Sequence, residues 1–140
     1  MANMINVSLK ESGLLHGQMV IERRDAITDE LKERIVIDNL VCNTGKNTVA
    51  ARINGETGVT SGVINYMAVG TGTNIPAASD TTLQTEIART TVSSNSRSLN
   101  VATITFFFGS ASGNGTLREA GAYFDGTGVS NSGFLFDRVN

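Results

Sequence analysis

The chain has 140 residues, 40% of them hydrophobic, which suits one domain that buries roughly two thirds of its unfolded surface. A formal net charge of −2 provides no basic field for nucleic-acid phosphates, and no stretch approaches the ~20 apolar residues of a membrane span. The first residues lack the apolar core of a signal peptide. We therefore expect a soluble protein, made in a cytoplasm, that binds neither nucleic acid nor membrane.

Residues 1–16 show no hydrophobic periodicity and are interpreted as an N-terminal arm, while residues 17–140 are interpreted as a single domain. The arm contains apolar side chains that can add a strand or enter a groove elsewhere, namely Met4, Ile5, Val7, Leu14 and Leu15. We expect the arm to reach a neighbouring subunit and to be disordered in the isolated protein.

Two segments that mix apolar and charged residues, 18–24 and 31–41, flank a turn at residues 25–30 and predict a β-hairpin. A helix over residues 28–37, capped by Thr28, is the alternative. The β-branched run IVIDNLV favours the strand.

Two helical segments are expected. One short helix runs from about residue 46 to residue 53, with Gly55 as its C-terminal cap. The other is a helical turn over residues 81–87, capped by Ser79 or Asp80.

The remaining chain predicts strands at residues 63–69, 90–97, 99–109, 117–124 and 134–139, of which the second and third form a hairpin. The first is apolar on both faces and is expected at the centre of a sheet. About seven short strands with Gly-rich turns predict a mainly β fold, an antiparallel, jelly-roll-like β-sandwich with one or two short helices. The side chains expected to line its core are Val63, Tyr66, Ile104, Phe106, Phe108, Leu117, Phe134 and Phe136.

Charged residues become sparse after Thr57, where Ser, Thr, Asn and Gly dominate. On one predicted strand, Thr103, Thr105 and Phe107 share the face opposite to the core residues. An apolar ring on a polar face indicates a partner, and interface cores are depleted in charge. We expect another copy of the chain, or another protein, to cover this face.

The titratable residues offer little for catalysis. The single histidine, His16, lies in the arm, and Cys42 has apolar neighbours and no evident base, so neither a catalytic triad nor a three-ligand imidazole or thiolate metal site can be assembled. The glycines at 45 and at 70–72 lack the spacing of phosphate and dinucleotide loops. A glycosidase pair could only come from Asp80, Glu86, Glu119 and Asp125, with no tryptophan to stack a sugar. We expect no enzymatic activity, cofactor or metal.

Glu119 lies in mid-strand among small residues, where a charge is costly unless it is paired. Arg89 and Arg138 each close an apolar segment and are the candidate partners. Arg118 is adjacent in sequence and points to the opposite face. Two interpretations remain, an internal ion pair that fixes the sheet register or a side chain at an interface.

Several strings occur in a recognisable order: AVGTGT, AASDTTL, EIAR, NGTLREAGAYF and FLFDRV, at residues 68–73, 77–83, 86–89, 114–124 and 134–139. The upstream VCNTGKNTVAARI adds to the pattern. Over more than half of its length, the chain resembles small structural proteins of tailed bacteriophage virions, of the tail-fibre, baseplate, collar or decoration type.

This resemblance implies a non-enzymatic virion component, synthesised in the host cytoplasm and assembled in multiple copies with other tail, neck or capsid proteins. The chain has no collagen-like repeat or heptad pattern to build a long fibre alone, so a small tail, collar or fibre-associated adaptor is the first interpretation. A capsid decoration protein is one alternative. A receptor- or carbohydrate-binding module is another, although the chain has no tryptophan and only two tyrosines.

Overall fold

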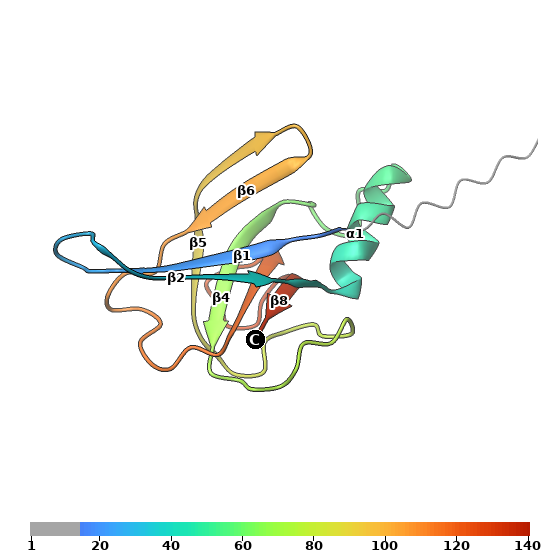
Figure 1. Ribbon diagram of the computed structural model, residues 1–140. Helices are drawn as coiled ribbons and strands as arrows, with labels where there is room; N and C mark the ends of the chain where they lie inside the picture. The colour runs from blue at the N-terminus through green and yellow to red at the C-terminus, as the bar shows by residue number, and fades with distance from the viewer. Residues whose placement is uncertain (1–14) are drawn as a thin grey trace, which may run out of the picture.

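An antiparallel sheet of six strands forms the body of the protein (Figure 1). The computed structural model describes residues 15–140, so most of the arm predicted over residues 1–16 lies outside the described part. The elements in chain order are β1 (Gln18–Arg24), β2 (Leu31–Asp38), β3 (Leu40–Val41), α1 (Asn43–Ile53), β4 (Ile64–Gly70), β5 (Glu86–Ser98), β6 (Val101–Phe106), β7 (Glu119–Phe124) and β8 (Phe134–Val139). The sheet has the order β3-β8-β7-β4-β5-β6, and β1 and β2 form a separate two-stranded ribbon.

The β1–β2 ribbon crosses one face of the six-stranded sheet, and its turn extends beyond the body (Figure 1). At the base of the ribbon, the cross-strand pair Met19 and Ile37 packs against Val69, Ala120 and Val139 of the sheet. This apposition of antiparallel sheets gives the predicted mainly β, β-sandwich-like fold, with one helix in the described residues.

The opposite face of the sheet carries a second apolar cluster. Because side chains alternate along β4, Ala68 points to this face while Val69 points to the ribbon. The cluster joins Ala68 to residues of β7 and β8 and of the flanking loops, namely Cys42, Leu83, Tyr123 and Leu135. The Cys42 thiol is buried, and burial raises its pKa to about 11.

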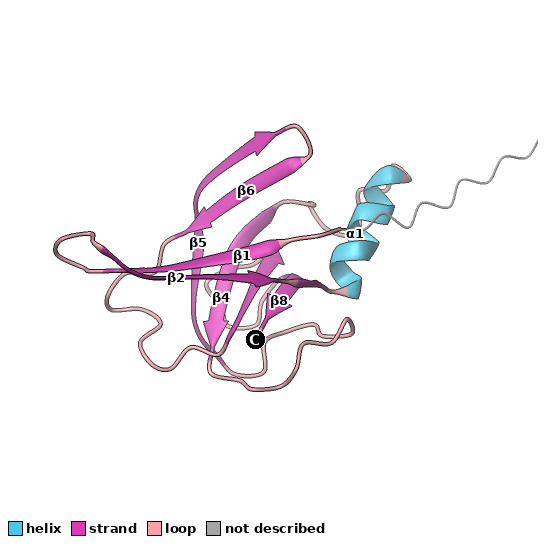
Figure 2. Ribbon diagram, viewed as in Figure 1, coloured by secondary structure: helices cyan, strands magenta, loops and turns pink. Residues whose placement is uncertain are grey.

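The helix stands at one end of the sheet beside β8 (Figure 2). Its Gly45 permits the contact, because a Cβ atom at this position would lie 2.7 Å from the backbone oxygen of Phe136. Within residues 15–140, no helix is long and apolar enough to cross a membrane.

The hairpins predicted at residues 18–41 and 90–109 are both present, and β4 occupies the predicted central position. The first hairpin is shorter than predicted: β2 ends at Asp38, and the chain then moves to pair with β8 as β3. The helix α1 begins at Asn43 rather than at residue 46. Gly55 terminates it as predicted: it follows the C-cap residue Asn54 with a positive φ of 80°, and the amides of Gly55 and Glu56 donate to the carbonyl oxygens of Arg52 and Ala51.

The helical turn predicted over residues 81–87 is wrong. The amides of Gln84 and Thr85 donate to the carboxylate of Glu119, and the amide of Leu83 donates to the hydroxyl of Tyr123. These tertiary acceptors replace the carbonyl oxygens that a helix would use, so the chain stays irregular until β5 begins.

The predicted core is only partly correct. Val63, Leu117 and Phe134 are 60%, 45% and 46% exposed. The other predicted members, Tyr66, Ile104, Phe106, Phe108 and Phe136, are half-buried. The position of these residues explains their exposure: Val63 and Leu117 lie just before β4 and β7, and Phe134 is the first residue of β8, so all three are at strand ends. The buried interior is filled instead by Tyr123 and Leu135 packed against small residues such as Gly121, where a Cβ atom would lie 2.8 Å from Leu135.

Candidate functional site

Glu119 and Arg138 form a buried ion pair between the neighbouring strands β7 and β8. Arg138 Nη2 donates to Glu119 Oε2 at 3.0 Å, and the two side chains are 3% and 0% exposed in that order. The register places Arg138 opposite Gly121, two residues from Glu119 and on the same face of β7. The predicted pairing of Glu119 with Arg138 is therefore confirmed.

The same carboxylate accepts three backbone hydrogen bonds. Glu119 Oε1 accepts from the amides of Gly72 at 3.0 Å and Thr85 at 2.7 Å, and Oε2 accepts from Gln84 at 2.9 Å. A side chain at Gly70 or Gly72 would collide with this carboxylate, which explains the Gly-Thr-Gly-Thr string. Glu119 thus holds both ends of the loop formed by residues 71–85.

Arg138 secures the middle of that loop. Its Nη1 donates to Asp80 Oδ2 at 2.8 Å, and its Nη2 also donates to the carbonyl oxygen of Asn74 at 3.3 Å. Asp80 in turn accepts from the amide of Ala77 at 2.8 Å. We call Glu119, Arg138 and Asp80 the Glu119 clamp; its charges are used to fix the loop over residues 71–85.

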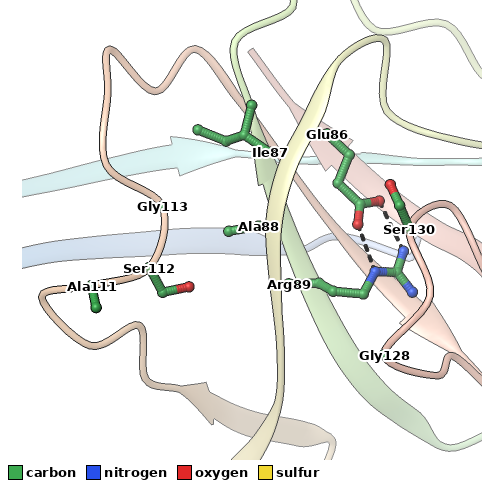
Figure 3. Close-up of a pocket in the computed structure, with 9 residues that line it drawn as sticks. All are labelled: Glu86, Ile87, Ala88, Arg89, Ala111, Ser112, Gly113, Gly128 and Ser130. Carbon is green, nitrogen blue, oxygen red and sulfur yellow. Dashed lines mark hydrogen bonds and ion pairs between the residues drawn. The ribbon is translucent and has the colours of Figure 1, made fainter.

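Arg89, the other candidate partner of Glu119, pairs with Glu86 instead (Figure 3). Arg89 Nε donates to Glu86 Oε1 at 2.6 Å and Nη2 donates to Oε2 at 2.9 Å, with both side chains buried. Residues three apart on a regular strand point to opposite faces. Here Gly70 pairs with Glu86 and Val69 with Ala88, so Ile87 forms a bulge and both charged side chains reach the same face.

The Arg89–Glu86 pair holds a second loop, over residues 127–132. Arg89 Nη1 donates to the carbonyl oxygens of Thr127 at 3.0 Å and Ser132 at 3.1 Å, and Glu86 Oε2 accepts from the amide of Asn131 at 3.0 Å. Burial by itself would raise the pKa of Glu86, but the hydrogen bonds from Arg89 and Asn131 outweigh it, and the pKa lies below its ordinary value. We call Arg89 and Glu86 the Arg89 clamp.

A surface depression of about 430 Å³ lies beside the Arg89 clamp, between Ile87 and the loop residues Ala111 to Gly113 and Ser130 (Figure 3). The charged groups at its edge, Glu86 and Arg89, pair with each other and with backbone atoms of the loop over residues 127–132. In the part of the chain that the structure describes, no group of three or more His, Cys, Asp or Glu side chains could hold a metal ion.

Asp137 is a buried carboxyl that the sequence analysis missed. It accepts hydrogen bonds from the amide of Ala122 at 3.2 Å and from Asn39 Nδ2, and burial raises its pKa to about 7. Asn39 Oδ1 is buried and has no hydrogen-bond partner among residues 15–140. The sequence did contain a signal. Asp137 and Arg138 are adjacent in a strand that is covered on both faces, so one of the two charged side chains had to point to each face.

Thr103, Thr105 and Phe107 are exposed, as the predicted partner face requires, and Phe107 is 71% exposed. Thr103 pairs across the strands with Ser96, and Thr105 pairs with Ser94. We call these five residues the Ser/Thr strip. It carries no charge and ends in an exposed aromatic ring.

The β1–β2 ribbon exposes apolar side chains on both faces. Val20 and Val36, 48% and 46% exposed, pair directly on one face, and Ile21 and Ile35 pair on the other. Charged side chains of the ribbon pair with one another across the strands, as in Arg23–Glu33, with 3.2 Å between Nε and Oε2. The ribbon packs on the sheet at its base through Met19 and Ile37, and these aliphatic pairs further along it stay exposed.

Comparison of the chain with protein-family models, with curated proteins and with solved structures finds no match.

Proposed function

We propose that the chain is a non-enzymatic structural component of a bacteriophage virion: a small tail, collar or fibre-associated adaptor that assembles in multiple copies with other virion proteins. The observation that carries the proposal is the projecting β1–β2 ribbon, whose two faces expose directly paired aliphatic side chains. Burying such pairs against a neighbour removes apolar area from water, at about 25 cal/mol for each Å².

The Ser/Thr strip supports the same proposal from another side of the molecule. A surface without charge has a low desolvation cost on contact, and an exposed phenylalanine can serve as an anchor in a partner's pocket. The ribbon and the strip offer two separate contact surfaces, which an adaptor between neighbouring subunits requires.

The two clamps explain what the strings that resemble virion proteins do in the fold. Those strings supply every charged member of both clamps: Asp80, Glu86, Arg89, Glu119 and Arg138. Buried pairs of this kind hold loops in one conformation and leave few charges free for chemistry. A rigid body with prepared contact surfaces supports an assembly role.

The proposal is tested on particles purified from infected cells in which the phage produces the chain with an epitope tag after Asn140. We expect several copies per particle by quantitative mass spectrometry, and gold-labelled antibody at the tail or collar in electron micrographs. Label over the head surface would favour a decoration protein, and particles without the chain would contradict the proposal.

A pair of variants tests the ribbon itself. Val36→Asp places a charge on the exposed aliphatic face and is expected to lower incorporation at least tenfold. Ala26→Asp adds the same charge in the exposed turn of the ribbon and is the matched control, expected to incorporate normally. Equal incorporation of both variants would show that the ribbon is not a contact surface.

A further inference from the structure

An apolar groove of about 300 Å³ lies between the β1–β2 ribbon and the sheet. Its apolar walls come from four strands, with Val41, Ile64, Met67, Ile104, Phe106 and Phe136. Most of these side chains are only half-buried, and their remaining exposed surface gathers in the groove.

Polar groups at the groove are arranged to receive a backbone. Asn39 and Asp137 line it, and the buried Asn39 Oδ1 lacks a donor among the residues that the structure describes. The strand β6 also borders the groove and is the outermost strand of the sheet, so one of its edges is unpaired within residues 15–140. Unpaired strand edges and apolar pockets together are the features that bind an extended peptide.

We propose that the groove binds residues 4–7, Met-Ile-Asn-Val, from the N-terminal arm of a second copy of the chain. In an extended segment Ile5 and Val7 share one face and can enter the apolar groove together. The backbone N–H groups on the segment's edge can donate to the carbonyl oxygens of the outermost strand β6 that are free within residues 15–140.

The place where the arm leaves the body favours a second copy over the chain's own arm. Leu15 and His16 line the groove, so the arm starts at its rim. The residues nearest to the rim, 8–14, include Lys10, Glu11 and Ser12 and would put charges over apolar walls. For its own residues 4–7 to enter, the chain would have to reverse within this seven-residue spacer and close a loop.

In the neighbour's arm, residues 8–14 act as a polar bridge that spans up to ~25 Å when extended. Each copy then donates one arm and accepts another, either reciprocally in a closed dimer or head-to-tail in a ring or a filament. This inference rests on the proposed assembly in multiple copies and names the contact that drives it.

Disulfide trapping distinguishes the two sources of the arm. Full-length Ile5→Cys and Ile104→Cys chains are mixed and oxidised, and we expect a covalent heterodimer on non-reducing gels. Cys42 is buried, with a raised pKa, and should stay unreacted. Ile5→Cys mixed with Val129→Cys, an exposed position on the loop between β7 and β8, is the control and should give no dimer above background.

The double variant with both cysteines in one chain completes the test. Linked oligomers would support exchange between copies, whereas an internal link in a monomer would show that the arm occupies its own groove and would overturn the proposal. No link of either kind would overturn it as well.

Light scattering of the full-length protein provides a second measurement. Ile5→Asp is expected to lower the oligomer mass to that of the monomer, while Ser8→Asp, with the same charge in the spacer, leaves the mass unchanged. Oligomers that persist in Ile5→Asp would overturn the arm contact without affecting the proposed virion role. Absence of the chain from particles would overturn the virion role alone.

Discussion

Arg138 on β8 and Glu119 on β7 meet in the interior of the protein, with 3.0 Å between Nη2 and Oε2. The carboxylate has four donors, this guanidinium and the amides of Gly72, Gln84 and Thr85. An ion pair that joins two strands and also receives backbone amides from a loop fixes tertiary structure. The alternative interpretation, that Glu119 faces a neighbouring subunit, does not agree with its burial.

Removing the carboxylate should strongly destabilise the domain. Glu119→Ala leaves the Arg138 charge buried with Asp80 as its one remaining counter-ion among residues 15–140 and also leaves three amides without acceptors, so we expect a loss of ~3–5 kcal/mol in the free energy of unfolding. Glu119→Ala with Arg138→Ala should cost less than the sum of the single changes. Urea denaturation of the three variants measures both effects.

The exposed pair Arg23–Glu33 is the matched control for this experiment. Glu33→Ala should change stability by less than about 1 kcal/mol, because solvent screens surface ion pairs. An unchanged unfolding midpoint in Glu119→Ala would show that the buried pair does not stabilise the fold.

Arg89→Lys tests the Arg89 clamp. Lysine keeps the charge but cannot make the two-pronged contact with Glu86 and the contacts with Thr127 and Ser132 together, so we expect a loss of about 1–3 kcal/mol. Hydrogen exchange should become faster at the amides of residues 127–132, while amides of β1 and β2 stay unchanged. Protection of residues 127–132 equal to that of the wild type would contradict the role of Arg89 in holding this loop.

The strands were predictable because their signals are local. Alternation of apolar and polar residues located both hairpins, and the bounds predicted at residues 134–139 match β8. The charge of Glu119 among small residues also indicated a buried arginine partner correctly, since an unpaired charge in that position would be too costly.

The features that the sequence did not predict depend on contacts between residues far apart in the chain. Residues 79–87 begin like a capped helix, but Glu119 and Tyr123, far along the chain, accept their amide hydrogens. The Glu86–Arg89 pair was missed because only the bulge at Ile87 brings their side chains to one face. A bulge is defined by pairing with β4 and has no clear local signal.

Asp137 should make stability depend on pH. Its pKa rises from 3.8 to about 7 on folding. Between these values the folded chain keeps a proton that the unfolded chain has lost, so the free energy of unfolding falls as the pH rises and levels off above the folded pKa. The effect is ~1.4 kcal/mol for each unit of pKa difference.

Asp137→Asn removes this proton exchange and keeps an oxygen that can accept from Ala122. The difference in unfolding free energy, wild type minus variant, should therefore decrease between about pH 4 and pH 7. Comparing the two proteins cancels the opposite trend from Glu86, whose lowered pKa stabilises the fold above its unfolded value. A constant difference across this range would mean that Asp137 titrates normally in the folded protein.

Phe106 and Phe107 are adjacent in sequence, and their substitutions should separate folding from assembly. Phe106 is half-buried and lines the groove, so Phe106→Ala should cost ~1–3 kcal/mol, less than the ~3–5 kcal/mol of a fully buried phenylalanine. Phe107→Ala removes a ring that is 71% exposed and should leave the melting temperature of the isolated protein unchanged.

If another virion protein covers the Ser/Thr strip, Phe107→Ala should still lower incorporation into particles several-fold, because the Phe107 ring would be a buried anchor in that contact. Thr28→Ala, at an exposed site on the distant turn of the β1–β2 ribbon, is the control for incorporation. Normal incorporation of Phe107→Ala would show that the strip is free in the assembled particle, and a lowered melting temperature would show that the ring already packs within its own chain.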